Sequence, residues 1–363
     1  MGLFKRTAAC LVGMALLFST AAAETTLHFT FAGDCTLGSE EAKRKQATSF
    51  DSVITEKGYD WPFANMQELF QNDDLTVVNL EGVLSDSNRN ENKDKTYRFR
   101  GPTAFVDILT RSGIEAVNLA NNHTQDFGKQ GYTATQETLA AAGVGYFGSR
   151  SVYIFEKDGI KVAFFGLNST AFNGNKAWAK EEIARLKQEE GVNAVVFTFH
   201  AGQEYGKHRN QAQETYAHYM IDAGADLIIG HHPHVVQGME IYNNRTICYS
   251  LGNFAFGGNK EVRALETVVV DVALTFDDAG NYLGQQLTLP ANISGTYPEN
   301  NYQPVLVSGD AAQDVMALIQ NDTDYELAPY TDEAGCAQQP YLPAQPEGSS
   351  GSDADGDFTV AEE

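Results

Sequence analysis

Basic residues are scarce in this chain of 363 residues, and no lysine or arginine follows Arg263. The sequence has 25 Lys and Arg against 48 Asp and Glu, which gives a formal net charge of −23. A surface this acidic repels polyanions. The charge balance therefore argues against nucleic acids and anionic membrane surfaces as partners.

Cysteine is also scarce, with four residues in the whole chain. Cys10 belongs to the first 23 residues, which leaves Cys35, Cys248 and Cys336 beyond them. An odd number of cysteines cannot form a complete disulfide framework. We expect Cys35 and Cys248, which lie in strand-like segments, to behave as small buried hydrophobic residues.

Long hydrophobic runs are missing as well. The apolar run at 7–18 follows Lys5 and Arg6, is too short to span a bilayer comfortably and precedes three alanines at 21–23. This order is typical of a cleaved secretory signal, with an uncleaved membrane anchor as the alternative. We predict a signal peptide at 1–23 and an exported protein, extracellular or associated with the cell envelope, with no stable membrane insertion after cleavage.

The rest of the chain first alternates short apolar runs with helix-like segments. The expected strands are 27–32, 75–80, 116–120, 162–167, 194–199 and 227–229, and the segments between them include expected helices at 103–112, 133–142, 180–189 and 211–223. Such alternation is typical of βαβ units and a parallel sheet. Four later strands without helices, at 239–242, 246–250, 265–276 and 282–289, indicate an antiparallel part. We predict an α/β fold with a mixed sheet or two packed sheets.

The chain is expected to divide into one main domain and two smaller C-terminal parts. The main domain covers 24–290, and an extension with one helix at 311–320 covers 291–343. From 344 to 363 the sequence consists mostly of Pro, Gly, Ser, Asp and Glu, with no basic residue. Such a composition cannot bury enough apolar surface to fold. We therefore predict a disordered acidic tail.

Polar side chains with metal-binding chemistry follow the expected strands at the point where each strand ends. They are Asp34, Glu81, Asn122, His123, His200, His232 and His234. The carboxyl ends of parallel strands gather along one edge of a sheet, which is where open α/β sheets build their sites. Carboxylate, amide and imidazole ligands suit divalent ions such as Mn, Fe or Zn. Each residue alone has an ordinary structural explanation as a cap, turn or core residue, but their coincidence at strand ends indicates a site.

The segment His231-His232-Pro233-His234 is the strongest single signal. Three of the eight histidines of the chain crowd into this one strand-end turn. The H-x-H spacing of His232 and His234 places two imidazoles on the same side of an extended segment, a geometry that chelates metal. Folding by itself requires no histidine there.

Seven segments in this order resemble the CapA (poly-γ-glutamate capsule synthesis) family of the calcineurin-like metallophosphoesterase superfamily. They are FTFAGDCTLG, VVNLEGVLSD, FRGPTAF, NLANNHTQDFG, FTFHAGQEY, IIGHHPHVVQG and YSLGNFAF. The resemblance implies a four-layer α/β/β/α sandwich with a dinuclear metal site. It also implies six metal ligands at Asp34, Glu81, Asn122, His200, His232 and His234. Thr36 stands where the superfamily has a histidine, so one of the two metal subsites is short of a ligand.

The resemblance and the residue chemistry together imply a mechanism. Two ions about 3.5–4 Å apart clamp a phosphate and activate a bridging water. His123 stands beside the metals as general acid or charge stabiliser, since imidazole titrates near neutral pH. Arg100 is a candidate anion clamp, because a guanidinium matches phosphate or carboxylate in a bidentate manner, with an ordinary surface arginine as the alternative.

The implied substrate is an anionic phosphoester or a γ-glutamyl polymer. Two other functions stay open from the sequence. One is a non-catalytic role in the assembly, export or binding of an anionic surface polymer. The other is amide hydrolysis of a γ-glutamyl polymer at the same metals, since both reactions develop an oxyanion that metals stabilise.

Overall fold

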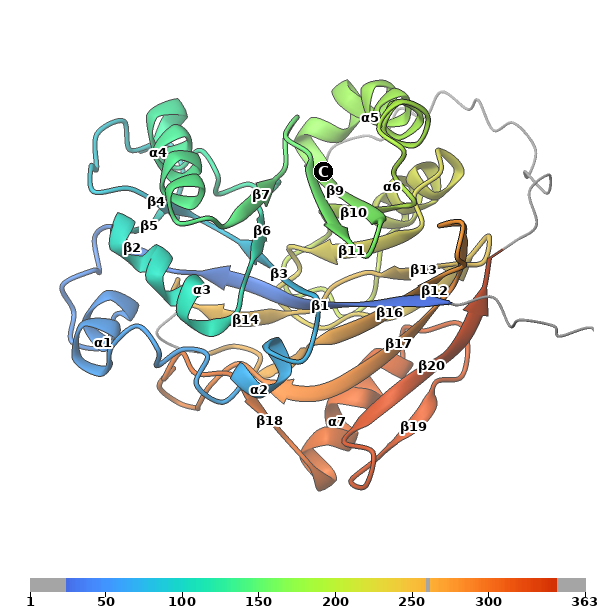
Figure 1. Ribbon diagram of the computed structural model, residues 1–363. Helices are drawn as coiled ribbons and strands as arrows, with labels where there is room; N and C mark the ends of the chain where they lie inside the picture. Colours follow the sequence, from blue (N-terminus) through green and yellow to red (C-terminus); the bar gives the residue numbers. More distant parts are fainter. Residues whose placement is uncertain (1–23, 259–261, 345–363) are drawn as a thin grey trace, which may run out of the picture.

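The computed structural model describes residues 24–258 and 262–344 (Figure 1). The predicted signal peptide at 1–23 and the predicted acidic tail after Ala344 lie outside the described residues. Strands and helices combine into a mixed α/β fold, which confirms the predicted class. The helices are α1 (Phe50–Lys57), α2 (Gln67–Phe70), α3 (Val106–Ser112), α4 (Gly128–Ala141), α5 (Ser169–Glu189), α6 (Gln211–Asp222) and α7 (Gly309–Gln320).

The larger sheet has eleven strands, with the path β19-β20-β17-β16-β1-β3-β6-β7 and with β14, β15 and β18 attached beside it. Its members are β1 (Thr25–Thr36), β3 (Leu75–Leu80), β6 (Ala116–Asn118), β7 (Gly145–Phe147), β14 (Asn253–Phe256), β15 (Glu266–Val268), β16 (Val270–Phe276), β17 (Tyr282–Ile293), β18 (Val305–Leu306), β19 (Ala328–Thr331) and β20 (Cys336–Pro343). Strands β1, β3, β6 and β7 run parallel, whereas β16, β17 and β20 add antiparallel neighbours. The sheet is therefore mixed, and β17 and β20 carry it past residue 290.

The second sheet has six strands in the order β12-β13-β11-β10-β9-β8. They are β8 (Tyr153–Lys157), β9 (Ile160–Asn168), β10 (Ala194–His200), β11 (Leu227–His231), β12 (Met239–Tyr242) and β13 (Arg245–Cys248). A small third sheet joins β2 (Ser39–Glu40), β5 (Phe99–Gly101) and β4 (Val83–Leu84). Strands β3 and β10 are buried along their whole length, which explains why they read as continuous apolar runs.

The two large sheets share one hydrophobic cluster, and helices cover their other faces. Phe29 of β1 meets Phe164 of β9 with ring centroids 5.6 Å apart, inside a cluster that draws on both sheets. Helices α5 and α6 bury apolar side chains against the second sheet. Helices α1, α3 and α4 do so against the first sheet (Figure 1). Cys35 and Cys248 are buried free cysteines, as expected.

Strand register brings the polar strand ends together. In the larger sheet Asp34 pairs with Asn79, which pairs with Asn118, so that three polar residues form a row across β1, β3 and β6. In the second sheet His200 of β10 pairs with His231 of β11. Neighbouring residues in register place their side chains on the same face of a sheet. The two polar rows meet where the sheets face each other, and this is the site.

Candidate metal centre

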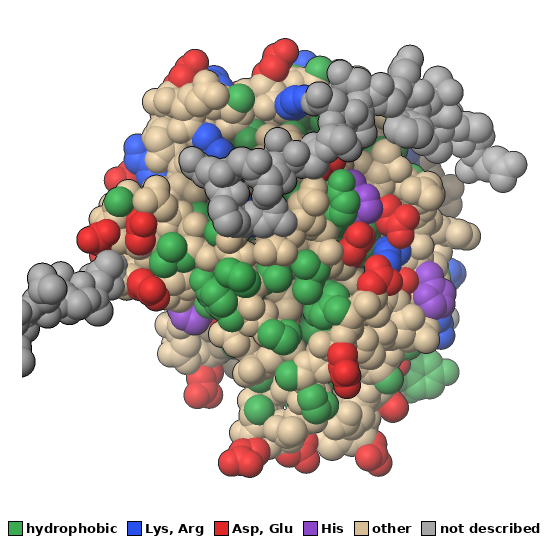
Figure 2. All heavy atoms as spheres, turned by 90° about the vertical axis from the view of Figure 1, so that its right-hand side faces the viewer, with side chains coloured by type: hydrophobic (Ala, Val, Ile, Leu, Met, Phe, Trp, Pro, Cys, Tyr) green, Lys and Arg blue, Asp and Glu red, His purple; other side chains and the backbone are tan. Residues whose placement is uncertain are grey.

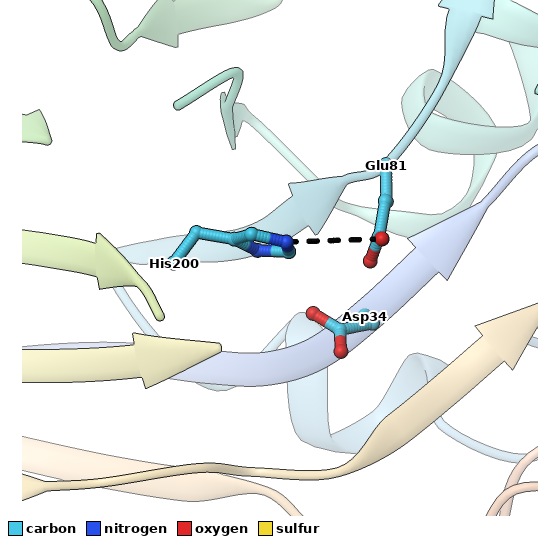
Figure 3. Close-up of side chains that lie close together, drawn as sticks. All are labelled: Asp34, Glu81 and His200. Carbon is cyan, nitrogen blue, oxygen red and sulfur yellow. Dashed lines mark ion pairs between the residues drawn. The ribbon is translucent and has the colours of Figure 1, made fainter. Parts of the chain in front are cut away.

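Three buried residues form the centre of the site. Asp34 near the end of β1, Glu81 directly after β3 and His200 at the end of β10 have ligand atoms that all lie within 4.8 Å of one another (Figure 3). Their side chains point into one space between the sheets. The two sheets thus each contribute to the same cluster, and these three strand-end residues together could hold a metal ion.

Glu81 lies among three imidazoles without a hydrogen bond to any of them. Its Oε1 is 3.7 Å from Nε2 of His123 and 3.8 Å from Nε2 of both His200 and His234. The side chain is fully buried, and neither carboxylate oxygen has a hydrogen-bond partner. Burial raises the pKa of Glu81 well above its usual value. An unpartnered carboxylate faced by nitrogen atoms slightly beyond hydrogen-bond reach has the chemistry and spacing of a metal ligand.

On one side of Glu81, three ligand-type atoms lie close together. The amide oxygen of Asn122 is 2.9 Å from Nε2 of His200, and Nδ1 of His232 is 3.1 Å from the same nitrogen. Atoms bonded to one ion at about 2.1 Å lie about 3–3.5 Å apart, so these separations fit a shared ion. Burial lowers the pKa of His200 well below its usual value and that of His232 to about 4. Both shifts favour the neutral ring, which is the form that binds metal.

On the other side of Glu81, His234 stands between two acceptors. Its Nδ1 is 3.1 Å from Oδ2 of Asp34 and 3.0 Å from the amide oxygen of Asn253. Burial disfavours the charged ring, but the Glu81 and Asp34 carboxylates outweigh this and raise the pKa of His234 to about 9. Burial would raise the pKa of Asp34, but the neighbouring His234 lowers it. The carboxylates around His234 therefore favour a positive charge at this position.

His231 belongs to this second group and was absent from the predicted ligands. It is 3% exposed, and its Nδ1 lies 3.5 Å from Oδ1 of Asp34 without a hydrogen-bond partner. The Thr36 hydroxyl, where the superfamily has its histidine, is also buried and unpartnered. The two adjacent histidines of the HHPH turn could have indicated His231 as a ligand. The H-x-H spacing, however, led us to predict only His232 and His234. Register with His200 is what turns His231 toward Asp34.

The backbone of the histidine turn is held in unusual conformations. His232 has a φ of 104° and His234 a φ of 59°, both in the left-handed region that non-glycine residues seldom adopt. Such conformations persist only where the surroundings enforce them, and they concentrate at functional sites. The turn thereby presents both imidazoles to the space beside Glu81.

A ladder of asparagines positions Asp34. Asn79 donates from Nδ2 to Oδ1 of Asp34 (2.8 Å). The amide oxygen of Asn79 in turn accepts from Nδ2 of Asn118 (3.0 Å) and of Asn121 (3.2 Å). All of these side chains are buried. Since the hydrogen bonds of Asn79 are already taken, it orients a ligand rather than serving as one.

His123 lies beside the cluster and has its own carboxylate partner. Its Nδ1 is 2.7 Å from Oδ2 of Asp126, and Asp126 also accepts from Nζ of Lys95 (2.6 Å) and from the backbone N–H of Phe99 (2.8 Å). Burial lowers the pKa of His123, although Asp126 opposes this effect. Asp126 was not among the predicted site residues. It holds the ring through Nδ1, so that Nε2 faces Glu81.

Arg100 is not available as the anion clamp that the sequence suggested. Its guanidinium donates to both carboxylate oxygens of Glu41 (2.9 and 3.0 Å) and to the carbonyl oxygen of Ser85 (2.5 Å). Only 7% of the residue is exposed. The predicted clamp is therefore wrong, because the hydrogen-bond donors of Arg100 already bind Glu41 and Ser85 next to the small third sheet.

A hollow opens above His123 and His234. Its other lining residues are Tyr97, Phe99, Glu204, Tyr205, Phe256 and Arg263. Aromatic rings thus form much of the wall, and one arginine and one glutamate provide its charges. The hollow reaches the cluster from the surface.

Comparison with known proteins identifies the family. The model of the family "Bacterial capsule synthesis protein PGA_cap" matches residues 28–258, which include all the residues of the cluster described above. The chain belongs to this family.

Individual relatives agree with the family match. A capsule biosynthesis protein CapA of Bacillus anthracis is 30% identical over 228 residues, and a PGA biosynthesis protein CapA of Bacillus subtilis is 30% identical over 252. These alignments cover 56% and 64% of the chain and the same shares of the two relatives. A probable polyglutamine synthesis accessory protein of Mycobacterium tuberculosis is 25% identical over 64% of the chain and 70% of that protein. The chain thus spans less than two thirds of either Bacillus protein.

One negative finding concerns membranes. Within the described ranges, no helix combines the length and the apolar character needed to cross a bilayer.

Proposed function

We propose that this chain is an exported metal-dependent hydrolase of the calcineurin-like metallophosphoesterase type, with a four-layer α/β/β/α sandwich. The observation that carries the proposal is Glu81, a fully buried carboxylate with two unpartnered oxygens among three imidazole nitrogens. A charge buried in this way costs several kcal/mol unless a cation accompanies it. A divalent ion is the cation that this set of ligands fits.

Two groups of residues would hold metal ions. Asp34 and His234 would hold one ion, with His231 as the additional nitrogen ligand where Thr36 offers none. Asn122, His200 and His232 would hold a second, and the Glu81 carboxylate lies within 3.8 Å of both His200 and His234. The unpartnered atoms of Asp34, Glu81 and His231 support this assignment, and Mn, Fe or Zn suits the mixture of nitrogen and oxygen ligands. When bound, such ions lower the pKa of a bound water and stabilise negative charge on the reacting group.

His123 handles the proton of the leaving group. Its Nε2 faces the cluster, while Asp126 holds the ring through Nδ1 and favours its protonated form. Lys95 and the Phe99 backbone fix Asp126 in turn. An imidazole so oriented donates a proton to a departing oxygen or nitrogen without binding metal. The hollow above His123 is where the substrate enters.

The names of the relatives, which concern capsule and PGA biosynthesis, support a biological role. We infer that this chain acts in the synthesis of an anionic surface polymer, after export directed by residues 1–23. Its substrate is a phosphoester or a γ-glutamyl chain. The alternative functions are non-catalytic assembly and γ-glutamyl amide hydrolysis. An activity screen distinguishes both from phosphoester hydrolysis.

The test joins metal analysis with turnover. Protein comprising residues 24–363 is loaded with Mn, Fe or Zn, its metal content is measured by mass spectrometry, and hydrolysis of p-nitrophenyl phosphate, bis-p-nitrophenyl phosphate and γ-glutamyl-p-nitroanilide is followed. We expect two ions per chain and turnover of at least one phosphoester, both abolished in Asp34→Asn. His218→Ala is the matched control, since His218 pairs with Glu240 (2.9 Å) away from the site. Turnover of the anilide alone would identify an amidase, and metal binding without any turnover would favour the assembly role.

A further inference from the structure

The hollow above the metal centre contains a cation that the proposed chemistry does not use. Arg263 lines this hollow together with His123 and His234, which belong to the centre. Arg263 is exposed and lies just beyond the segment that matches the family model. Its guanidinium carbon lies 5.0 Å from the centre of the Tyr205 ring, a stacked arrangement typical of arginine.

Arg263 differs from the arginines that hold the fold together. Arg98 pairs with Glu91 and Arg100 with Glu41, whereas none of the ion pairs formed within the described part of the chain involves Arg263. Glu204 lines the same hollow but forms no ion pair with it. The hydrogen-bonding edge of the guanidinium is thus not committed to a described carboxylate.

The ring beneath Arg263 is tied to the histidine turn. The backbone N–H of Tyr205 donates to the carbonyl oxygen of Pro233 (2.7 Å), between His232 and His234. The Tyr205 and His234 ring centroids are 6.2 Å apart. Together with the 5.0 Å from guanidinium to Tyr205, this places the Arg263 charge within about 11 Å of the His234 ring. The cation therefore lies within reach of the metal centre.

This position matters because the whole protein repels anions. Its formal net charge is −23, and acidic side chains outnumber basic ones on the face in Figure 2. An anionic substrate needs local cations at the site to overcome that field. Lys95 already binds Asp126, and Arg100 binds Glu41. Arg263 is the cation of the hollow that remains for a ligand.

We propose that Arg263 binds a carboxylate of the substrate next to the reacting group, which makes it a specificity residue for a polycarboxylate chain. The inference rests on the proposed function, from which it takes the hollow as the substrate site, the metal centre and the γ-glutamyl chain. In a γ-linked glutamate residue, four C–C bonds of about 1.5 Å place the free carboxylate about 5 Å from the chain carbonyl. A guanidinium within about 11 Å of His234 reaches that carboxylate while the carbonyl lies at the metal centre.

The experiment measures binding rather than turnover. Metal-loaded protein is titrated by calorimetry at low salt with a γ-linked glutamate hexamer, with the neutral γ-linked glutamine hexamer and with inorganic phosphate. Mass spectrometry checks that the peptides stay intact. We expect the glutamate hexamer to bind more tightly than the glutamine hexamer, and Arg263→Gln to weaken only the glutamate hexamer, by about tenfold or more. Arg263→Lys should restore part of the loss, since lysine keeps the charge without the planar fork.

Arg150→Gln is the matched control, because Arg150 is an exposed arginine over another aromatic ring, Trp178 (5.4 Å), that does not line the hollow. It should bind like the wild type. Equal affinity of Arg263→Gln and wild type for the glutamate hexamer would overturn the proposal, as would equal binding of the two hexamers by the wild type. Loss of phosphate binding alone would assign Arg263 to a phosphate and also overturn it. If no substrate is turned over but Arg263-dependent binding persists, the hydrolase proposal fails and this one stands.

Discussion

Replacement of Glu81 by glutamine tests the metal centre through stability. Glu81 is fully buried, and the nearest nitrogens lie 3.7–3.8 Å from Oε1, beyond hydrogen-bond reach. In metal-free protein the carboxyl group therefore has no hydrogen-bond partner, and the attraction of its charged form to His234, 3.8 Å away, is set against a burial cost of several kcal/mol. Glu81→Gln keeps the shape and removes the charge. We expect metal-free Glu81→Gln to be as stable as metal-free wild type or more stable, within about 1 kcal/mol.

The response to metal should be the opposite. An ion present at a hundred times its dissociation constant stabilises wild type by about 2.7 kcal/mol, a rise in melting temperature of about 3.5 °C for a chain of this size. Glu81→Gln should lose most of that rise in differential scanning fluorimetry with MnCl₂.

Asp226→Asn is the control for removal of a buried carboxylate. Asp226 is 3% exposed and binds Lys187 (2.9 Å), Arg245 (3.1 Å) and the backbone N–H of Val195 (2.9 Å). Because Lys187 is partly exposed, we expect a loss of about 1–3 kcal/mol in the free energy of unfolding, with the Mn response intact. If Glu81→Gln instead destabilised the metal-free protein as Asp226→Asn does, and still responded to Mn, Glu81 would be a structural residue and the reasoning would be refuted.

Three further predictions concern the histidines. His123→Ala should retain metal, measured by mass spectrometry, and lose about 10²–10⁴-fold in turnover of substrates with poor leaving groups, whereas His200→Ala should lose metal and activity together; metal loss in His123→Ala would make it a ligand. His231→Gln should weaken one of two ions at least tenfold in a chelator competition and leave the other in place, and unchanged affinities would reduce His231 to a neighbour of Asp34. Chemical denaturation of metal-free protein should show greatest stability near pH 6.5. His231 and His232 have lowered pKa values of about 4 in the folded protein, so stability is lost as the pH falls from 6.5 toward 4 and the unfolded chain takes up protons. His234 has a raised pKa of about 9, so stability is lost as the pH rises from 6.5 through 9. A flat profile would contradict these assignments.

The sequence by itself determined the elements and the edge at which the site forms. A short apolar run that ends in Asp34, Glu81 or His200 is readable as a strand with a polar end. Parallel strands of one sheet place such ends along one edge, which accounts for Asp34 and Glu81. His200 was also predicted as a strand-end residue, but it belongs to the other sheet and joins them in Figure 3 because the two sheets pack face to face. The H-x-H spacing likewise identified the turn that contains His232 and His234.

Only the tertiary structure decided which partner each side chain has. Arg100 matched an anion clamp by its chemistry, but Glu41 lies 59 positions away and takes its guanidinium. His231 was not predicted as a ligand, but its register with His200 of β10 places its side chain beside Asp34.

Asp126 and Arg263 show the same limit. No spacing rule relates Asp126 to the backbone of Phe99, or Arg263 to the ring of Tyr205. Local sequence governs backbone conformation and strand ends, because those depend on neighbours along the chain. Hydrogen bonds between side chains require distances of about 3 Å between segments that meet only when the two sheets pack.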